Sequence, residues 1–164
     1  MSPYLTEELR AGDRIELRGP VGGYFVWTPE RGGPLMLVAG GSGVVPLMAI
    51  LRHHRASGSD VAATLLLSSR SWDDVIYRAD LERIDGNGAQ IVHTLTRSHP
   101  EGWTGYARRV DEAMLREVVP PPSELPLVYV CGPTPFVEAV ASALVALGHA
   151  AGNVKTERFG PTGG

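Results

Sequence analysis

Cysteine is nearly absent from this sequence. Cys131 is the only cysteine among 164 residues, so no disulfide can form within the chain. The N-terminal residues also lack the basic and apolar regions of a secretory signal. Because disulfides are typical of oxidising compartments, these two absences predict a cytoplasmic protein.

Long apolar runs and an excess of positive charge are missing as well. No segment approaches the roughly 18 uncharged apolar residues of a membrane-spanning helix. The formal net charge is −3, whereas nucleic-acid binding needs a basic face. His53 and His54 are adjacent and would face different directions on a helix, and His93 and His99 lack partners at ligand spacing. We therefore predict no membrane, no nucleic acid and no metal.

What the sequence does contain is a regular alternation of two kinds of segment. Short, mostly apolar runs that suit buried strands occupy residues 35–39, 62–67, 90–95, 127–131 and 154–159. Stretches with helical spacing lie between them, at residues 46–56, 79–84, 111–118 and 135–147. This order predicts an α/β fold with a five-stranded parallel sheet and helices on both faces. A ligand site is expected at the carboxyl ends of the strands.

Residues 1–31 differ from the rest. Polar and apolar residues alternate over 14–18, a glycine-rich break follows, and 24–27 resumes an extended pattern. We predict a short β segment over 1–31 and a separate α/β domain over 32–164.

The clearest motif is the glycine loop of residues 40–46, between the first apolar run and the following helix. Glycine permits a sharp turn and lets a diphosphate approach the backbone, while the helix N-terminus favours negative charge. The spacing, Gly41-x-Gly43-x-x-Pro46, is neither the common G-x-G-x-x-G pattern nor a P-loop. Taken alone, the loop also fits a tight strand-to-helix turn without a ligand.

Four segments together resemble the ferredoxin–NADP reductase superfamily. They are Gly19-Pro-Val-Gly-Gly-Tyr-Phe25, the glycine loop from Gly40 to Pro46, Val130-Cys-Gly-Pro133 and Thr156-Glu-Arg-Phe159. They occur in the family's order and cover essentially the whole chain. The resemblance implies an NAD(P)H-binding domain over 32–164, preceded by a remnant of a flavin-binding β-barrel.

The flavin half departs from the family pattern. The Arg-x-Tyr-Ser/Thr motif that holds the flavin ring in the family is absent from these residues. The family's second flavin motif would end at about Ser2. We therefore expect only the last barrel strands here, which leaves an exposed edge and apolar surface at Tyr24, Phe25 and Trp27. Residues 1–31 should then either pair with a second copy or pack irregularly.

The resemblance also implies roles for particular residues. The cofactor-binding set comprises Gly40, Gly41, Ser42, Gly43, Val44, Pro46, Ser69, Arg70, Thr96, Arg97, Cys131, Gly132 and Pro133, with Ser2 for flavin. The catalytic set comprises Cys131, Glu157 and Phe159, with Cys131 aligning the nicotinamide rather than acting as a thiolate. On burial alone, Cys131 would equally suit a small core residue.

The loops after the second and third strands bear on cofactor choice. Arg70 and Arg97 favour the 2′-phosphate of NADPH over NADH. Asp73 and Asp74 are interpreted as capping or preceding the next helix. Trp103 is interpreted as a packing anchor.

The leading hypothesis is an FAD-dependent oxidoreductase portion that passes hydride from NAD(P)H to flavin and electrons onward to an acceptor protein or module. The alternative is a dinucleotide-binding module that is inactive alone, because its flavin half is absent or on another chain. A self-contained dehydrogenase is disfavoured because no Tyr-x-x-x-Lys motif occurs.

Overall fold

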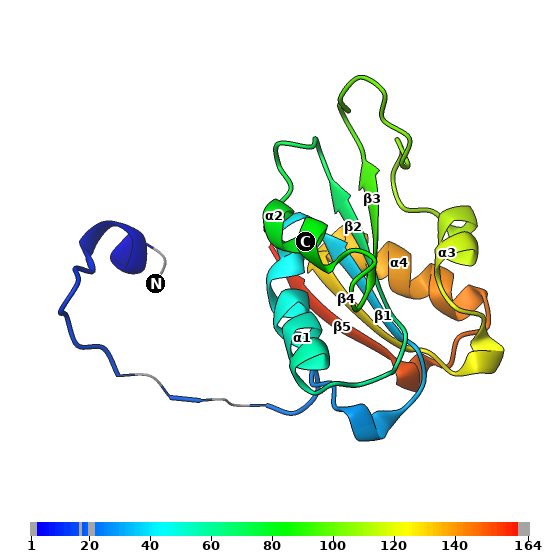
Figure 1. Ribbon diagram of the computed structural model, residues 1–164, viewed down its shortest axis with the longest axis horizontal. Coiled ribbons are helices and arrows are strands. Elements are labelled where there is room, and N and C mark those ends of the chain that lie inside the picture. The colour runs from blue at the N-terminus through cyan, green and yellow to red at the C-terminus, as the bar shows by residue number, and fades with distance from the viewer. Residues whose placement is uncertain (1–2, 17, 20–21, 161–164) are drawn as a thin grey trace.

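The computed structural model describes residues 3–16, 18–19 and 22–160. Its centre is one five-stranded parallel sheet, ordered β3-β2-β1-β4-β5 (Figure 1). The strands are β1 (Leu35–Gly40), β2 (Ala63–Ser69), β3 (Gln90–Leu95), β4 (Leu127–Pro133) and β5 (Val154–Phe159). The predicted fold class is therefore confirmed.

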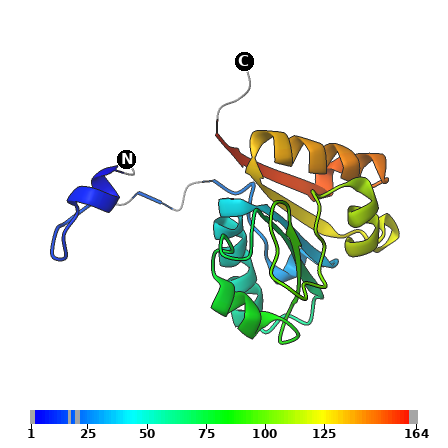
Figure 2. The same ribbon diagram turned by 90° about the horizontal axis from the view of Figure 1, so that it is seen from above.

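Four helices connect the strands and cover both faces of the sheet. They are α1 (Val44–Ala56), α2 (Arg78–Ile84), α3 (Glu112–Val118) and α4 (Thr134–Ala146). Helices α1 and α2 lie on one face, and α3 and α4 lie on the other (Figures 1 and 2). Each of the nine predicted strands and helices is present, with bounds that differ from the prediction by at most two residues.

The alternation of side chains along β1 produces two cores. Leu35, Leu37 and Ala39 belong to the cluster under α1, whereas Met36 and Val38 belong to the cluster under α4. All five are buried, which explains why the sequence of β1 is continuously apolar instead of alternating with polar residues.

The strand order places a switch point at β1. The chain runs from β1 outward to β2 and β3, then crosses to β4 and β5 on the other side. Loops after β1 and β4 therefore diverge from adjacent strand ends, and a crevice forms between them.

The prediction of a β segment over residues 1–31 is wrong for the part that the structure describes. Tyr4–Glu8 forms a short π-helical turn and Pro29–Arg31 a 3₁₀ turn, and no strand precedes Leu35 among the described residues. A strand requires a hydrogen-bonding partner, and an alternating pattern alone does not supply one. In Figures 1 and 2 the described residues before Tyr24 extend away from the sheet.

Residues 24–27, in contrast, pack against the α1 face. Trp27 is 2% exposed, and its ring centre lies 5.1 Å from that of His54. The Phe25 ring meets Tyr129 edge-on at 5.3 Å, and the Tyr129 hydroxyl donates a hydrogen bond to the Val26 carbonyl at 2.8 Å. The expected exposure is therefore wrong for Phe25 and Trp27 and holds for Tyr24, which is 56% exposed. Pairing with a second copy stays a prediction.

No described helix is both long and apolar enough to cross a membrane. No group of three or more His, Cys, Asp or Glu side chains in the described ranges is arranged to hold a metal ion.

If Trp27 is part of the core, its removal must destabilise the whole domain. Trp27→Ala should lower the free energy of unfolding by about 3 kcal/mol, because a large buried ring is lost. Tyr24→Ala is the matched control and should cost less than about 1 kcal/mol, since that ring is mostly exposed. Urea unfolding followed by circular dichroism measures both, and equal losses would show that residues 24–27 are not docked as described.

Candidate functional site

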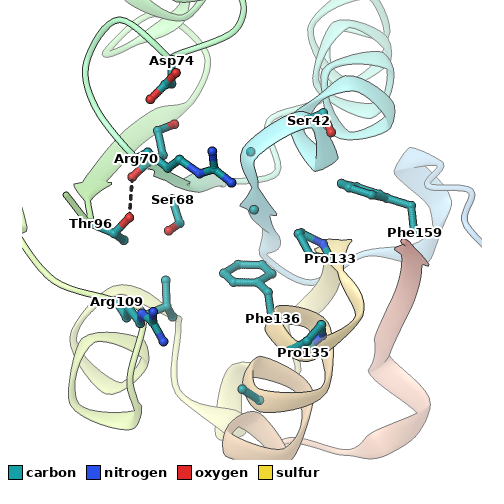
Figure 3. A pocket seen from close by; sticks show the side chains of 15 residues that line it. Ser42, Ser68, Arg70, Asp74, Thr96, Arg109, Pro133, Pro135, Phe136 and Phe159 are labelled. Carbon is teal, nitrogen blue, oxygen red and sulfur yellow. Dashed lines mark hydrogen bonds between the residues drawn. The ribbon is translucent and has the colours of Figure 1, made fainter. Parts of the chain in front are cut away.

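A cavity of about 680 Å³ lies at the carboxyl ends of the strands. The loops after β1, β2, β3 and β4 and the end of β5 surround it (Figure 3). Its lining residues are Gly40, Gly41, Ser42, Ser68, Ser69, Arg70, Asp74, Thr96, Arg109, Val110, Pro133, Pro135, Phe136, Ala139 and Phe159. The site therefore forms where the sheet topology predicts it.

The floor of the cavity is a phenyl ring packed on two glycines. A Cβ atom on Gly40 or on Gly132 would lie 2.8 Å from the Phe136 ring. The same atom on Gly132 would also lie 3.2 Å from the Gly40 Cα. Glycine at both positions lets β1, β4 and the ring approach closely, so the strand ends stay open to the cavity.

The glycine loop turns directly into α1. Gly41 has a φ of 54°, a left-handed conformation that favours glycine, and no atom lies within 4 Å of where its Cβ would be. Gly43 is required for another reason, since its Cβ would collide with the carbonyl of Cys131. Gly41 thus shapes the open side of the turn, and Gly43 holds it against β4.

The remaining loop residues divide between surface and core. Ser42 is exposed and lines the cavity. Val44 is completely buried in the α1 core, and Pro46 lies in the first turn of α1; neither lines the cavity. Gly41 and Ser42 therefore face the ligand space, beside a helix N-terminus whose first N–H groups have no partner within the helix.

Polar groups from β2 and β3 form the wall opposite α4. The Thr96 backbone N–H and hydroxyl both donate to the Ser69 carbonyl, at 3.0 and 3.2 Å. The Ser69 hydroxyl is buried and has no partner among the described residues. A buried hydroxyl in a cavity wall is available to a ligand.

Two guanidiniums line the cavity from different loops. Arg70 follows β2 and Arg109 precedes α3, and both are exposed lining residues. Neither makes an ion pair in the part of the chain that the structure describes. Arg97, predicted to act with Arg70, does not line the cavity; its backbone N–H instead donates to the Arg70 carbonyl at 2.9 Å.

Asp74 is the acid among the lining residues. It accepts a hydrogen bond from the Ser71 hydroxyl at 2.7 Å. Asp73 forms an ion pair with Arg78 at 3.5 Å. The N-cap of α2 is Tyr77, so the two aspartates precede the helix and do not cap it.

Cys131 and Glu157 are neighbours on β4 and β5 in the pairing register. Cys131 is 4% exposed and does not line the cavity directly. Burial, with a smaller contribution from the Glu157 charge, raises the pKa of the thiol to about 11. The thiol is therefore protonated at neutral pH, as the sequence analysis expects, and Glu157 is exposed outside the lining set.

Phe159 and Pro133 line the cavity on the other side of the glycine turn from Arg70 (Figure 3). They are register partners on β5 and β4, and Phe159 is 41% exposed. An exposed ring at the rim offers a flat apolar surface to a second aromatic group.

The structure brings together eight of the predicted site residues in one lining. They are Gly40, Gly41, Ser42, Ser69, Arg70, Thr96, Pro133 and Phe159. Gly43, Val44, Pro46, Arg97, Cys131, Gly132 and Glu157 lie outside it, and Ser2 is outside the described residues.

Several lining residues were not predicted as site residues. They are Ser68, Asp74, Arg109, Val110, Pro135, Phe136 and Ala139. Phe136 was recognised only for the helical spacing of α4. Arg109 lies 14 residues beyond the end of β3 at Leu95, and no motif marks where that loop returns to the cavity.

Comparisons with known proteins agree with this geometry. Residues 37–142 match the family model described as the oxidoreductase NAD-binding domain. NADH-cytochrome b5 reductase 1 of Emericella nidulans is 34% identical over 157 residues, covering 91% of this chain and 50% of the relative. NADH-cytochrome b5 reductase 2 of Rattus norvegicus is 32% identical and is covered over 60% of its length. The chain thus spans about half the length of the curated relatives it matches.

Solved structures with the same fold come from several reductases. The cytochrome b5 reductase domain of Ulva prolifera nitrate reductase aligns over 97% of this chain and 64% of its own, with a TM-score of 0.79 and 23% identity. The flavohem-like FAD/NAD-binding domain of Vibrio cholerae nitric oxide dioxygenase aligns over 98% and 64%, with a TM-score of 0.76 and 25% identity. By its family model, its motifs and its fold, the chain belongs to the oxidoreductase NAD-binding domain family of the ferredoxin–NADP reductase superfamily.

Proposed function

We propose that this chain is the nicotinamide-nucleotide-binding portion of a flavin-dependent oxidoreductase. The observation that carries the proposal is one cavity with a glycine turn at its centre, an exposed ring on one side and two guanidiniums on the other, neither of which is ion-paired among the described residues. The guanidiniums match the adenosine phosphate of a dinucleotide, the glycine turn matches its diphosphate, and the exposed ring matches its nicotinamide.

The fit to a dinucleotide rests on the shape and charge of the cavity. Its volume of about 680 Å³ is in the range of small-molecule and cofactor sites. Gly41 carries no side chain over the open side of the turn, and the N-terminus of α1 adds a favourable dipole for a diphosphate. The diphosphate would lie over Gly41 and Ser42.

The adenosine end of the cavity supports a preference for NADPH. Arg70 and Arg109 approach it from different loops, and neither guanidinium is neutralised by an ion pair within the described ranges. Guanidiniums bind phosphate strongly through paired, charge-assisted hydrogen bonds. In this proposal Arg109, rather than Arg97, is the second phosphate-binding cation.

Asp74 supports the competing preference for NADH. A carboxylate after the second strand accepts hydrogen bonds from a ribose diol and repels a 2′-phosphate. Asp74 lines the same cavity, and the relatives compared above are named as NADH enzymes. Two cations against one carboxylate make NADPH the favoured ligand.

The opposite end of the cavity would meet the flavin. Flavin, when bound, supplies the hydride-accepting and one-electron chemistry that protein side chains lack. This chain would contribute the Phe159 ring as cover for the nicotinamide position. The neutral Cys131 thiol would pack behind it as a positioning group, with Glu157 as its charged neighbour.

An electron acceptor and a cytoplasmic location complete the proposal. The curated relatives are named for cytochrome b5, which supports an acceptor protein or module for the complete enzyme. The single cysteine, buried as a thiol, supports a reducing cytoplasm.

Removing the two guanidiniums should abolish discrimination between the two cofactors. The double variant Arg70→Ala/Arg109→Ala should bind NADP⁺ at least about 30-fold more weakly and NAD⁺ nearly unchanged, because each charged hydrogen bond contributes about 1.5–3 kcal/mol. Isothermal titration calorimetry at low salt measures the affinity for both ligands.

Arg108→Ala is the matched control, since Arg108 is ion-paired with Asp111 and lies outside the cavity lining. Equal losses for NADP⁺ and NAD⁺ would refute the assignment, and tighter NAD⁺ binding in the wild type would favour the role of Asp74.

The thiol of Cys131 should react only in strong alkali. Its pKa is raised from 9.0 to about 11, so its alkylation by iodoacetamide should rise through pH 11 and stay slow at pH 8. For the same reason, the stabilising contribution of the neutral thiol is complete below pH 9 and declines as the pH rises toward 11. Stopped alkylation assays on folded protein measure the profile, with urea-unfolded protein as control. Rapid labelling of the folded chain at pH 8 would contradict a buried, neutral thiol.

Turnover separates an enzyme portion from a binding module. The full chain is mixed with FAD, NADPH and ferricyanide, and NADPH oxidation is followed at 340 nm. Turnover that depends on FAD would support a catalytically competent chain. Tight NADP⁺ binding without turnover would instead support the alternative, a module that needs its flavin half from elsewhere.

A further inference from the structure

Two indole rings connect the loops that flank the adenosine end of the cavity. Trp72 lies in the loop after β2, and Trp103 lies in the loop after β3; both loops leave the same end of the sheet (Figure 1). Their ring centres are 5.4 Å apart at an interplanar angle of 51°. Neither ring lines the cavity, and both are half-buried. The contact therefore joins the two loops without occupying ligand space.

Trp72 is fixed from several sides. The His93 ring meets it edge-on at 5.1 Å, and the Arg78 guanidinium lies 5.4 Å from its centre. Arg78 also forms an ion pair with Asp73, the residue next to Trp72. The loop that carries Arg70 is thus held by β3 and by the start of α2.

Trp103 is fixed by its own loop. Its Nε1–H donates to the Tyr106 carbonyl at 3.1 Å, and that carbonyl also accepts from the Leu95 backbone N–H at 2.9 Å. Gly105 leaves room for the indole, because a Cβ there would collide with it. The Thr94 hydroxyl then donates to the Arg108 carbonyl. The backbone is therefore tied to β3 up to the residue before Arg109.

A second connection joins the two loops at their bases. The Arg97 and Ser98 backbone N–H groups donate to the Arg70 carbonyl, at 2.9 and 3.2 Å. Two separated ties restrict both the distance and the relative orientation of the loops, whereas one tie would leave a hinge. The Trp72–Trp103 contact is the outer tie, and it has no hydrogen bond across it among the described residues.

We propose that Trp72 and Trp103 are positioning residues, which hold the Arg70 and Arg109 guanidiniums in the spacing that a 2′-phosphate requires. The inference rests on the proposed NADPH-binding function. Bidentate contact to phosphate depends on geometry as well as charge, so the pair acts on phosphate recognition and leaves the glycine turn unaffected. Loosening it should weaken 2′-phosphate binding selectively.

The test uses two adenosine probes with the full chain. Adenosine 2′,5′-bisphosphate reports the 2′-phosphate contact, and adenosine 5′-monophosphate reports the remainder of the site. Trp72→Leu and Trp103→Leu should each weaken binding of the bisphosphate about fivefold or more and change binding of the monophosphate less than about twofold. Trp72→Phe and Trp103→Phe should restore part of the difference, because a ring is kept. Trp27→Leu is the matched control for an indole remote from both loops; it should lower stability without changing the ratio of the two affinities.

A double-mutant cycle shows whether the pair acts through the arginine. If Trp103 positions Arg109, Trp103→Leu should cost little more once Arg109→Ala is present. Additive losses, or equal weakening of both probes, would overturn the inference and indicate a general packing role. The phenylalanine variants give the same readout if a leucine variant fails to fold. A wild-type chain that binds both probes equally would remove the 2′-phosphate contact itself, and with it both the NADPH preference and the positioning role. A wild-type preference that the tryptophan variants leave intact would overturn only the positioning role.

Discussion

The close approach of the glycine turn to the end of β4 is the contact on which the site depends. The backbone of Gly43 lies against the carbonyl of Cys131 with no room for a side chain, and Gly40 and Gly132 share the Phe136 ring between them. Any Cβ at these positions would separate β1 from β4 at the point where the strand order reverses. The cavity, the start of α1 and the placement of Cys131 all follow from this one packing constraint.

Much of the fold was predictable because the sequence patterns that mark it are local. The run over β1 is apolar on both faces, and the α4 spacing of Val137, Val140 and Leu144 is helical, so each element follows from its own residues. Polar and apolar residues alternate regularly over 14–18, yet the residues of this segment that the structure describes form no strand. Alternation specifies which face of a strand is buried, but hydrogen-bonded neighbours decide whether a strand forms.

The site was only partly predictable for a related reason. Motifs identified Gly41, Ser42 and Arg70 because they follow strand ends directly. Arg109 reaches the cavity only because the loop after β3 is tied back to the strand through Tyr106 and Arg108. Asp74 could be read as a helix cap until the structure placed Tyr77 there. Long loops return to a site through tertiary contacts that no spacing rule contains.

The two ends of the cavity differ in their physical character, and this difference orients a ligand. The Arg70 end is polar and cationic, and it is built on two loops that the Trp72–Trp103 contact joins. The opposite end is formed by Pro133 and Phe159, and the Cys131 thiol, which lies outside the lining, is kept neutral by burial. A dinucleotide bound with its charged end toward the arginines must place its remaining ring beside the neutral end, next to Phe159. In the proposed complex, orientation would thus follow from the separation of charge along one cavity, and the glycine turn between the two ends would fix where the diphosphate crosses.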